Sequence, residues 1–289
     1  MTLRNLITGD ELLLAPGIYD ALSGLIATQS GAKAVYLSGA SLAYTRFGTS
    51  DIGLVSVSEV NDTIAAITDR IDTPIIVDGD TGFGNALNVQ RTVRSFERSG
   101  ADAIQLEDQS FPKKCGHLDG KKLISTKEMV GKIHAALDAR ANEETLIIAR
   151  TDARAVEGFS EAIDRAGAYK DAGADVLFVE APQSLDEMQK ICVEFSDKIP
   201  LLANMVEGGK TPILSADDLA ALGYKIAIFP GGAVRAISHH MEAYYLGLLA
   251  NGSNDAFSDK MHNFDSLNKL IGTNELIKHG AKYENKGSD

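Results

Sequence analysis

The chain has 289 residues, and its hydrophobic content of 44% is enough for one large core. Its formal net charge of −12 argues against a nucleic-acid partner but leaves room for an anionic substrate, because the local field of a site can oppose the net charge. Two cysteines cannot form a disulfide framework, and the sequence shows neither a signal-peptide pattern nor an apolar run long enough to span a membrane. We therefore expect a cytoplasmic protein with no membrane partner.

Eight short apolar runs recur along the chain and are separated by longer segments with helical periodicity. Continuous apolar strands that alternate with helices predict a parallel sheet, and eight such units favour a closed (β/α)8 barrel over an open sheet. We expect a single barrel domain over residues 1–289, with 251–289 as a C-terminal helical extension and tail. The eight runs cover residues 12–20, 34–39, 74–80, 103–108, 146–152, 176–182, 200–207 and 226–232.

Five segments between these runs have the periodicity and the capping residues of helices. Several begin with Ser or Thr followed three residues later by Glu, which is the reciprocal cap of a helix start. Several end at a glycine, where the chain turns back toward the next strand. The predicted helices cover residues 56–71, 86–101, 125–140, 159–174 and 184–195.

Polar side chains follow the predicted strands at the points where the strands end. In a (β/α)8 barrel these ends share one mouth, and catalytic residues lie there. Buried strands would normally finish in neutral turn residues, so a ring of carboxylates, amides and one arginine predicts an active site at this mouth. The residues are Tyr19, Asp20, Ser38, Gly39, Asp78, Asp80, Glu107, Asp108, Arg150, Asp152, Glu180, Asn204, Pro230, Gly231 and Gly232.

Asp78 and Asp80 lie two residues apart and so share one face of an extended strand end. Two carboxylates held close together repel unless a cation lies between them, and their oxygens suit Mg²⁺ or Mn²⁺. Glu107, at the next strand end, could hold water molecules of such an ion. The alternative interpretation is an Asp-Gly turn with solvated side chains.

Arg150 ends the predicted strand "LIIAR", where a guanidinium without a partner would be costly to bury. We interpret it as a bidentate ligand for a substrate carboxylate. A structural ion pair with Asp152 or Glu180 is the alternative.

The segment Phe111–Lys122 contains a cysteine, Cys115, among lysines and glycines rather than in an apolar run. Its two internal glycines predict a mobile loop that follows the fourth strand and can fold over the mouth. A thiol near neutral pKa could act as a nucleophile or a general acid, whereas a free thiol on a surface loop is the alternative. The residues expected to lower that pKa are Lys113, Lys114 and His117.

These residues resemble the isocitrate lyase and phosphoenolpyruvate mutase superfamily over nearly the whole chain. The run "KKCGH" at 113–117 is similar to the signature of its lyase branch. Further blocks match in order: "YLSG", "SDIGL", "VDGDTGFGN", "LEDQ", "IARTDA" and "LLANMVEGGKTP". Mutases that rearrange phosphonopyruvate lack the Cys-Gly-His loop, so the chain resembles the carbon–carbon bond lyases.

The resemblance implies a Mg²⁺ cofactor, with Mn²⁺ or another divalent ion as an alternative. It implies that Asp78 ligates the metal while Asp51, Asp80 and Glu107 hold its waters. It also implies a barrel whose last helix is exchanged between subunits, commonly in a homotetramer. The substrate-binding residues that it implies are Ser38, Gly39, Ala40, Gly116, Arg150, Glu180, Asn204 and Arg235.

The chemistry expected from the resemblance is cleavage of a 2-hydroxy acid. Chelation to the metal lowers the pKa of the substrate hydroxyl, a base removes its proton, and the C2–C3 bond breaks. The departing carbanion is stabilised by cations and protonated by the general acid. We expect Cys115 as the acid, Arg150 and His117 among the catalytic residues, and Tyr36 as the candidate base.

The substrate is predicted from one position in the C-terminal helices. Methylisocitrate lyases of this superfamily carry an additional arginine there for a third carboxylate, whereas this chain has Phe264. We therefore expect a branched dicarboxylate, 2,3-dimethylmalate, to be cleaved to pyruvate and propionate. The alternatives are a tricarboxylate (2-methylisocitrate), a phosphonate substrate of the kind used by carboxyphosphonoenolpyruvate mutase, and a barrel that acts as a scaffold without catalysis.

Overall fold

The computed structural model describes residues 2–284, and the chain divides into two compact units between Val234 and Arg235. The division falls inside helix α11 (Gly232–Asn251), before residue 251, where we placed the start of the extension. The end of the predicted C-terminal tail lies outside the described residues.

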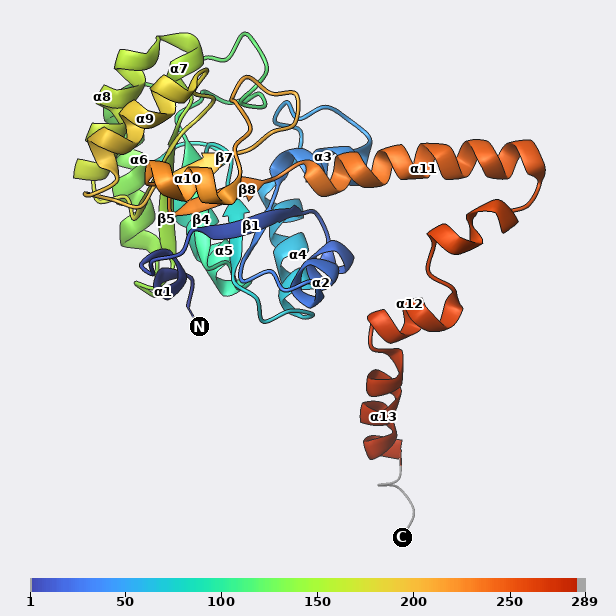
Figure 1. Ribbon diagram of the computed structural model, residues 1–289. Coiled ribbons are helices and arrows are strands. Elements are labelled where there is room, and N and C mark those ends of the chain that lie inside the picture. Colours follow the sequence, from blue (N-terminus) through green and yellow to red (C-terminus); the bar gives the residue numbers. More distant parts are fainter. Residues whose placement is uncertain (1, 285–289) are drawn as a thin grey trace. The chain divides into compact units, whose positions relative to one another are not determined.

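Eight parallel strands form the sheet of the first unit in the order β6-β5-β4-β3-β2-β1-β8-β7. A single parallel bridge between Leu177 and Leu201 joins β6 to the segment before β7, so the sheet nearly closes on itself (Figure 1). The predicted (β/α)8 barrel is confirmed. The strands are β1 (Leu13–Ile18), β2 (Val35–Leu37), β3 (Ile75–Asp78), β4 (Ala103–Glu107), β5 (Leu146–Thr151), β6 (Val176–Val179), β7 (Leu202–Asn204) and β8 (Ile226–Phe229).

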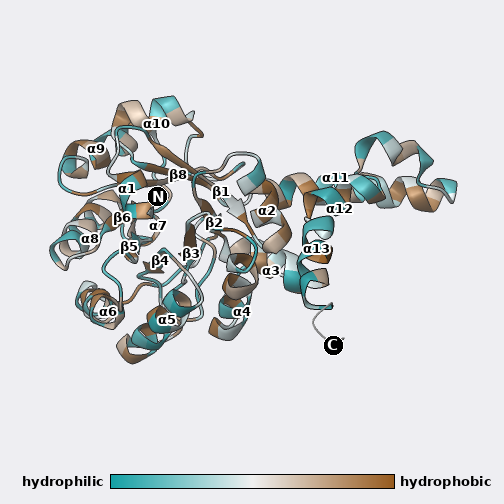
Figure 2. Cartoon of the chain, turned by 90° about the horizontal axis from the view of Figure 1, so that it is seen from below, coloured by the Kyte–Doolittle hydropathy of each residue, from teal (hydrophilic) through white to brown (hydrophobic). Residues whose placement is uncertain are grey.

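Helices surround this sheet, as Figure 2 shows in a view from below the barrel. The helices of this unit are α1 (Leu3–Ile7), α2 (Ala21–Gln29), α3 (Gly39–Phe47), α4 (Val57–Thr68), α5 (Ala86–Arg98), α6 (Thr126–Ala139), α7 (Ala153–Val156), α8 (Phe159–Asp171), α9 (Leu185–Phe195) and α10 (Ala216–Leu222). All five predicted helices are present, and the predicted serine caps form in α4, α6 and α9, whereas α8 begins at Gly158 without a side-chain cap. The Ser56 hydroxyl accepts the Glu59 N–H, while the Glu59 carboxylate accepts the Ser56 N–H at 2.8 Å.

Two apolar clusters stabilise the first unit. One fills the barrel interior, where strand residues such as Ile76 and Ile148 lie with Leu3 of α1. The other lies between the strands and the surrounding helices and includes Val93 and Tyr169. Because α1 supplies apolar side chains to the interior, the amino-terminal end of the barrel is filled, and polar chemistry is left to the carboxyl end.

The second unit continues α11 and then contains a short 3-10 helix (Asp255–Lys260), α12 (Phe264–Leu270) and α13 (Thr273–Glu284). No residue of α12 or α13 is buried within the described chain, although several are large and apolar. Exchange of a helix between subunits stays a prediction. Among the described residues, no helix is both long and apolar enough to cross a membrane.

Candidate active site

Asp78, the last residue of β3, accepts hydrogen bonds from three sides. Its Oδ1 accepts from the Gln105 side-chain amide and from the Asp80 backbone N–H, both at 3.2 Å. Its Oδ2 accepts from the Gly39 N–H at 3.3 Å. A Cβ at Gly39 would lie 3.0 Å from that oxygen, so glycine lets the start of α3 approach the carboxylate closely. The predicted binding segment 38–40 therefore begins beside Asp78.

A buried lysine ammonium lies between two of the predicted metal-site carboxylates. The Lys113 Nζ is 2.6 Å from Asp51 Oδ1 and 2.7 Å from Asp80 Oδ1, and its side chain is 3% exposed. Burial raises the pKa of Asp80 to about 7, with Asp78 and Asp51 adding to the shift and Lys113 opposing it. Lys113 thus supplies positive charge between these carboxylates, and the metal ion that the sequence pattern predicted stays a prediction.

The oxygen atoms of this acidic cluster (Asp51, Asp78, Asp80 and Glu107) fit a hydrated divalent cation. The buried Glu107 Oε1 has no hydrogen-bond partner among the described residues, and Asp80 Oδ1 makes only the ion pair. Burial also raises the pKa of Glu107 well above its usual value, despite Arg150 nearby. Within residues 2–284, no group of three or more His, Cys, Asp or Glu side chains is arranged so that it could hold a metal ion directly. Mg²⁺ tolerates such an open set because it keeps several of its own waters.

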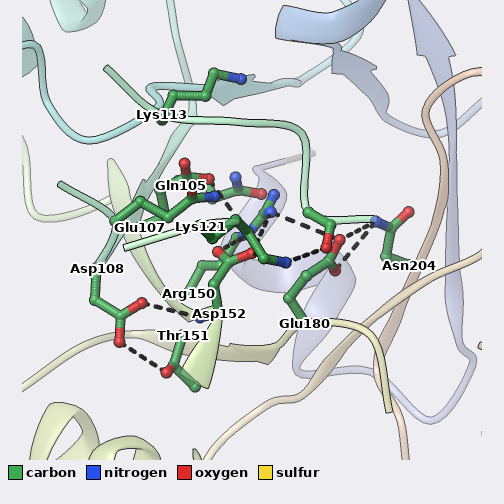
Figure 3. Close-up of polar contacts among 12 residues, drawn as sticks. Gln105, Glu107, Asp108, Lys113, Lys121, Arg150, Thr151, Asp152, Glu180 and Asn204 are labelled. Carbon is green, nitrogen blue, oxygen red and sulfur yellow. Dashed lines mark hydrogen bonds and ion pairs between the residues drawn. The ribbon is translucent and has the colours of Figure 1, made fainter. Parts of the chain in front are cut away.

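Arg150, in β5, lies at the centre of a second group of charges (Figure 3). Its guanidinium donates to both carboxylate oxygens of Asp152, at 2.9 and 3.1 Å. It also lies 3.3 Å from Glu107 Oε2 and 3.6 Å from Glu180 Oε1. The ion pairs of Arg150 with Asp152 and Glu180, which were the structural alternative to substrate binding, are thus both present. A substrate carboxylate would meet an arginine that is already fixed in place by Asp152.

Glu180, at the end of β6, joins this group to β7 and to the loop that carries Cys115. The Asn204 amide donates to both Glu180 oxygens at 3.2 Å. The His117 Nε2 lies 3.5 Å from Glu180 Oε1, and burial lowers the pKa of His117, which favours a neutral ring. The buried Asn204 Oδ1 has no hydrogen-bond partner in the described chain, so it can receive a donor from a ligand.

The Cys115 loop, defined as Phe111–Lys122, packs down onto the mouth of the barrel. The Cys115 N–H donates to the Asp51 carbonyl at 3.1 Å. A Cβ at Gly116 would collide with the side chains of Glu180 and Arg150, so this peptide lies directly on their ion pair. The loop therefore brings the thiol to the same mouth as the two charged groups.

The predicted effect of the loop lysines on the thiol is wrong. Burial raises the pKa of Cys115, and the charges of Asp51 and Glu180 add to the shift, whereas a hydrogen bond from the His117 backbone N–H opposes it as the sequence suggested for that residue. The lysines do not counter it because their charges are used elsewhere: Lys113 pairs with Asp51 and Asp80, and Lys114 donates to the Asp119 carbonyl. The thiol keeps its proton at neutral pH, which suits a general acid better than a nucleophile.

Tyr36, the candidate base, is buried inside the barrel below Asp78. Its hydroxyl donates to Gln105 Oε1 at 2.8 Å, and the other end of that amide donates to Asp78. Burial, with the Asp78 charge adding, raises the pKa of Tyr36 well above its usual value. These surroundings disfavour the phenolate, and the base role stays a prediction.

Two buried residues that shape this site, Gln105 and Lys121, were not among the predicted site residues. Gln105 is an amide within a largely apolar strand, which was a signal in the sequence, whereas Lys121 is one of four lysines in its loop and does not stand out by composition. Lys121 pairs with Asp152, at 3.0 Å. Arg235 belongs to the second unit and has an exposed side chain, and its predicted contact with the substrate stays a prediction.

Comparison with known families identifies the chain. The family described as phosphoenolpyruvate phosphomutase matches residues 3–249. The chain belongs to the phosphoenolpyruvate mutase/isocitrate lyase superfamily. It is 42% identical to the 2,3-dimethylmalate lyase of Eubacterium barkeri over 276 residues, which is 95% of this chain and 94% of the relative. It is 44% identical to the 2-methylisocitrate lyase of Aeropyrum pernix over 289 residues, which is 100% of this chain and 92% of the relative.

Solved structures agree with this assignment. A crystal structure of 2,3-dimethylmalate lyase superposes with a TM-score of 0.92 and 35% identity, covering 99% of this chain and 96% of that one. A phosphonopyruvate hydrolase in complex with oxalate and Mg²⁺ matches with a TM-score of 0.88 and 30% identity, covering 98% of this chain and 99% of that one. The prediction of a carbon–carbon lyase of this superfamily is confirmed. Two of these relatives are named for different substrates at similar identity, so the comparisons leave the substrate open.

Proposed function

We propose that this lyase cleaves 2,3-dimethylmalate to pyruvate and propionate with the help of Mg²⁺. The observation that carries the proposal is the position of the Cys115 loop. Its backbone binds Asp51 of the acidic cluster at Cys115 and lies against the Arg150–Glu180 ion pair at Gly116. A proton donor, a cation site and a carboxylate-binding arginine are therefore held within one mouth.

The acidic cluster would hold the metal, with Asp78 as the direct ligand and Asp51, Asp80 and Glu107 binding its waters. When bound, Mg²⁺ lowers the pKa of a chelated 2-hydroxyl and stabilises the oxygen charge that develops there. Segment 38–40 lies at the amino-terminal end of α3, where backbone amides favour an anionic carboxylate.

The remaining steps are carried out by side chains of this chain. Loss of the hydroxyl proton to a base leaves an electron pair on oxygen that forms the C=O bond of pyruvate, and the C2–C3 bonding electrons remain on C3. Arg150 stabilises the charge of that fragment. The S–H of Cys115 then gives its proton to C3, which yields propionate, and the thiolate recovers a proton from solvent. A thiol with a raised pKa supplies this proton without ionising beforehand.

The choice of a dicarboxylate rests on the second unit. Phe264 stands where we would place the arginine that binds a third carboxylate, and it is 83% exposed in the described chain. Methylisocitrate is the second candidate, because the chain matches a 2-methylisocitrate lyase along its whole length. We also propose that the C-terminal helices are exchanged between the subunits of a homotetramer. The second unit exposes the large apolar side chains of Leu249, Phe264 and Ile277, which such an exchange would cover.

Release of pyruvate from purified protein with Mg²⁺ tests the proposal. The value of kcat/KM is measured separately with 2,3-dimethylmalate and with 2-methylisocitrate. We expect the dicarboxylate to be preferred, whereas a higher kcat/KM for methylisocitrate would reverse the order. Phosphorus NMR with carboxyphosphonoenolpyruvate covers the phosphonate alternative, and absence of any turnover together with absence of Mg²⁺ binding would indicate a scaffold.

A further inference from the structure

Lys121 lies near the end of the Cys115 loop, yet its side chain turns inward and is only 1% exposed. Its ammonium donates to the carbonyl of Gly116, the residue that directly follows Cys115. The same ammonium donates to Asp152 Oδ1 at 3.0 Å. The buried Lys121 ammonium therefore links the Gly116 peptide, beside the thiol, to Asp152 at the rim of the barrel. Lys121 and Asp152 are labelled in Figure 3.

Asp152 is a rigid anchor for this contact because it is fully buried and bound from several directions. Both of its oxygens accept from Arg150. Its backbone N–H donates to Asp108 Oδ1 at 2.9 Å, and Asp108 in turn accepts from the Thr151 hydroxyl at 2.7 Å. Both side chains are buried, so removal of the Lys121 ammonium would leave the Asp152 carboxylate with less compensation for its buried charge than a surface carboxylate would have.

The other contacts of the Cys115 loop fall on two arms, one before the thiol and one after it. The arm before the thiol is held by the buried Lys113 ammonium, which pairs with Asp51 and Asp80, and by two hydrogen bonds between the Gln109 side chain and Lys114, at 2.8 and 3.0 Å. The arm after the thiol is held by Lys121 and by a hydrogen bond of 3.1 Å from the Lys210 N–H to the His117 ring. Among the described residues of the arm after the thiol, Lys121 is the only buried charged side chain that holds Gly116 in place.

We propose that Lys121 is a positioning residue that holds Cys115 over the mouth by binding the Gly116 carbonyl and Asp152 together. The role rests on the proposed function, since the thiol so placed is the proton donor to the departing carbanion. Gly116 also covers the Arg150–Glu180 pair. Loss of the Lys121 contacts would therefore let the arm after the thiol lift, expose the thiol and misplace its proton, while Lys113 in the other arm keeps its pairs with Asp51 and Asp80.

The test is the rate at which iodoacetamide alkylates Cys115 in Lys121→Met, followed by mass spectrometry of the Cys115 peptide. We expect the rate to rise at least about tenfold because the loop opens more often. With the preferred substrate, kcat should fall by about 30-fold or more while KM changes by less than about threefold. Lys122→Met is the matched control, because that neighbouring side chain is exposed, and both quantities should stay at wild-type values.

Alkylation needs no substrate, so it separates this inference from the proposed function. A folded Lys121→Met protein whose Cys115 reacts at the wild-type rate would overturn the positioning role, even if its activity were lost. Absence of turnover in the wild type would instead overturn the proposed function. If Lys121→Met fails to fold, the same rates are measured on Lys121→Ala, whose short side chain can neither donate to Gly116 nor pair with Asp152; an unchanged alkylation rate there would equally contradict the role.

Discussion

At the amino-terminal end of the barrel, Leu3 and Ile7 of α1 join an apolar cluster that fills the interior. At the carboxyl end, the same strands finish in buried charges such as Glu107 and Arg150, and the pKa of Glu107 is raised by its burial. The first end stabilises the fold by removing apolar surface from water. The second end costs folding free energy, and that cost is understandable only if the charges are needed for binding and catalysis.

The largest expected effect at the carboxyl end comes from Cys115→Ser. A serine hydroxyl is a far weaker acid than a thiol, so kcat should fall by about 10³-fold while substrate binding is retained. Steady-state pyruvate release and substrate titration measure the two quantities. The matched control is Cys192→Ser, a buried cysteine of α9 outside the site, which should keep the wild-type kcat. Unchanged kcat in Cys115→Ser would refute the role of this thiol as acid.

The next effect concerns metal binding and pH. Because Asp80 has a pKa raised to about 7, the metal-free fold binds more protons than the unfolded chain between about pH 4 and 7, and this group lowers stability as pH rises through that window. Mg²⁺ must displace the proton, so its dissociation constant should increase about tenfold from pH 8 to pH 6. Calorimetry of the metal-free protein measures this change. Asp80→Asn should remove much of the pH dependence, and a pH-independent affinity in the wild type would contradict the account.

A smaller effect on activity, but a clear one on stability, is expected at the opposite end. Leu3→Ala removes a buried side chain from the interior cluster and should lower the free energy of unfolding by about 2–4 kcal/mol. The kcat should not change, because the cavity lies far from the charged mouth. Chemical denaturation and pyruvate release test both statements, with the exposed Asn5→Ala in the same helix as control. A loss of kcat without a loss of stability would show that the two ends are not separate in function.

The smallest expected change is a gain of stability from Glu107→Gln. An amide keeps the shape of the side chain but removes a buried carboxylate whose pKa is raised, and Arg150 keeps its pairs with Asp152 and Glu180, so the metal-free protein should gain stability at pH 8. Mg²⁺ should bind more weakly, and activity should fall. Thermal unfolding in the absence of metal measures the gain, and a marked destabilisation would mean that Glu107 serves chiefly to hold Arg150.

The two ends also differ in how well the sequence predicts them. The barrel follows from eight apolar runs, and the site from charges where those runs stop, because parallel strands share one carboxyl edge. The direction of the Cys115 pKa shift was predicted wrongly because the partner of each lysine depends on tertiary contacts. Lys113 meets Asp51 and Asp80 from distant parts of the chain, and Lys121 meets Asp152, so their charges do not act on the sulfur as their spacing suggests.

The most direct test of the central claim is the cleavage of 2,3-dimethylmalate in D₂O with Mg²⁺, followed by analysis of the propionate. If the Cys115 thiol delivers the proton to C3, the wild type gives propionate with one deuterium at C2 in a single configuration. The residual turnover of Cys115→Ser should then give deuterium in both configurations, because solvent supplies it. Stereospecific deuteration retained in Cys115→Ser would contradict the account, since the proton donor would then be another group at the mouth.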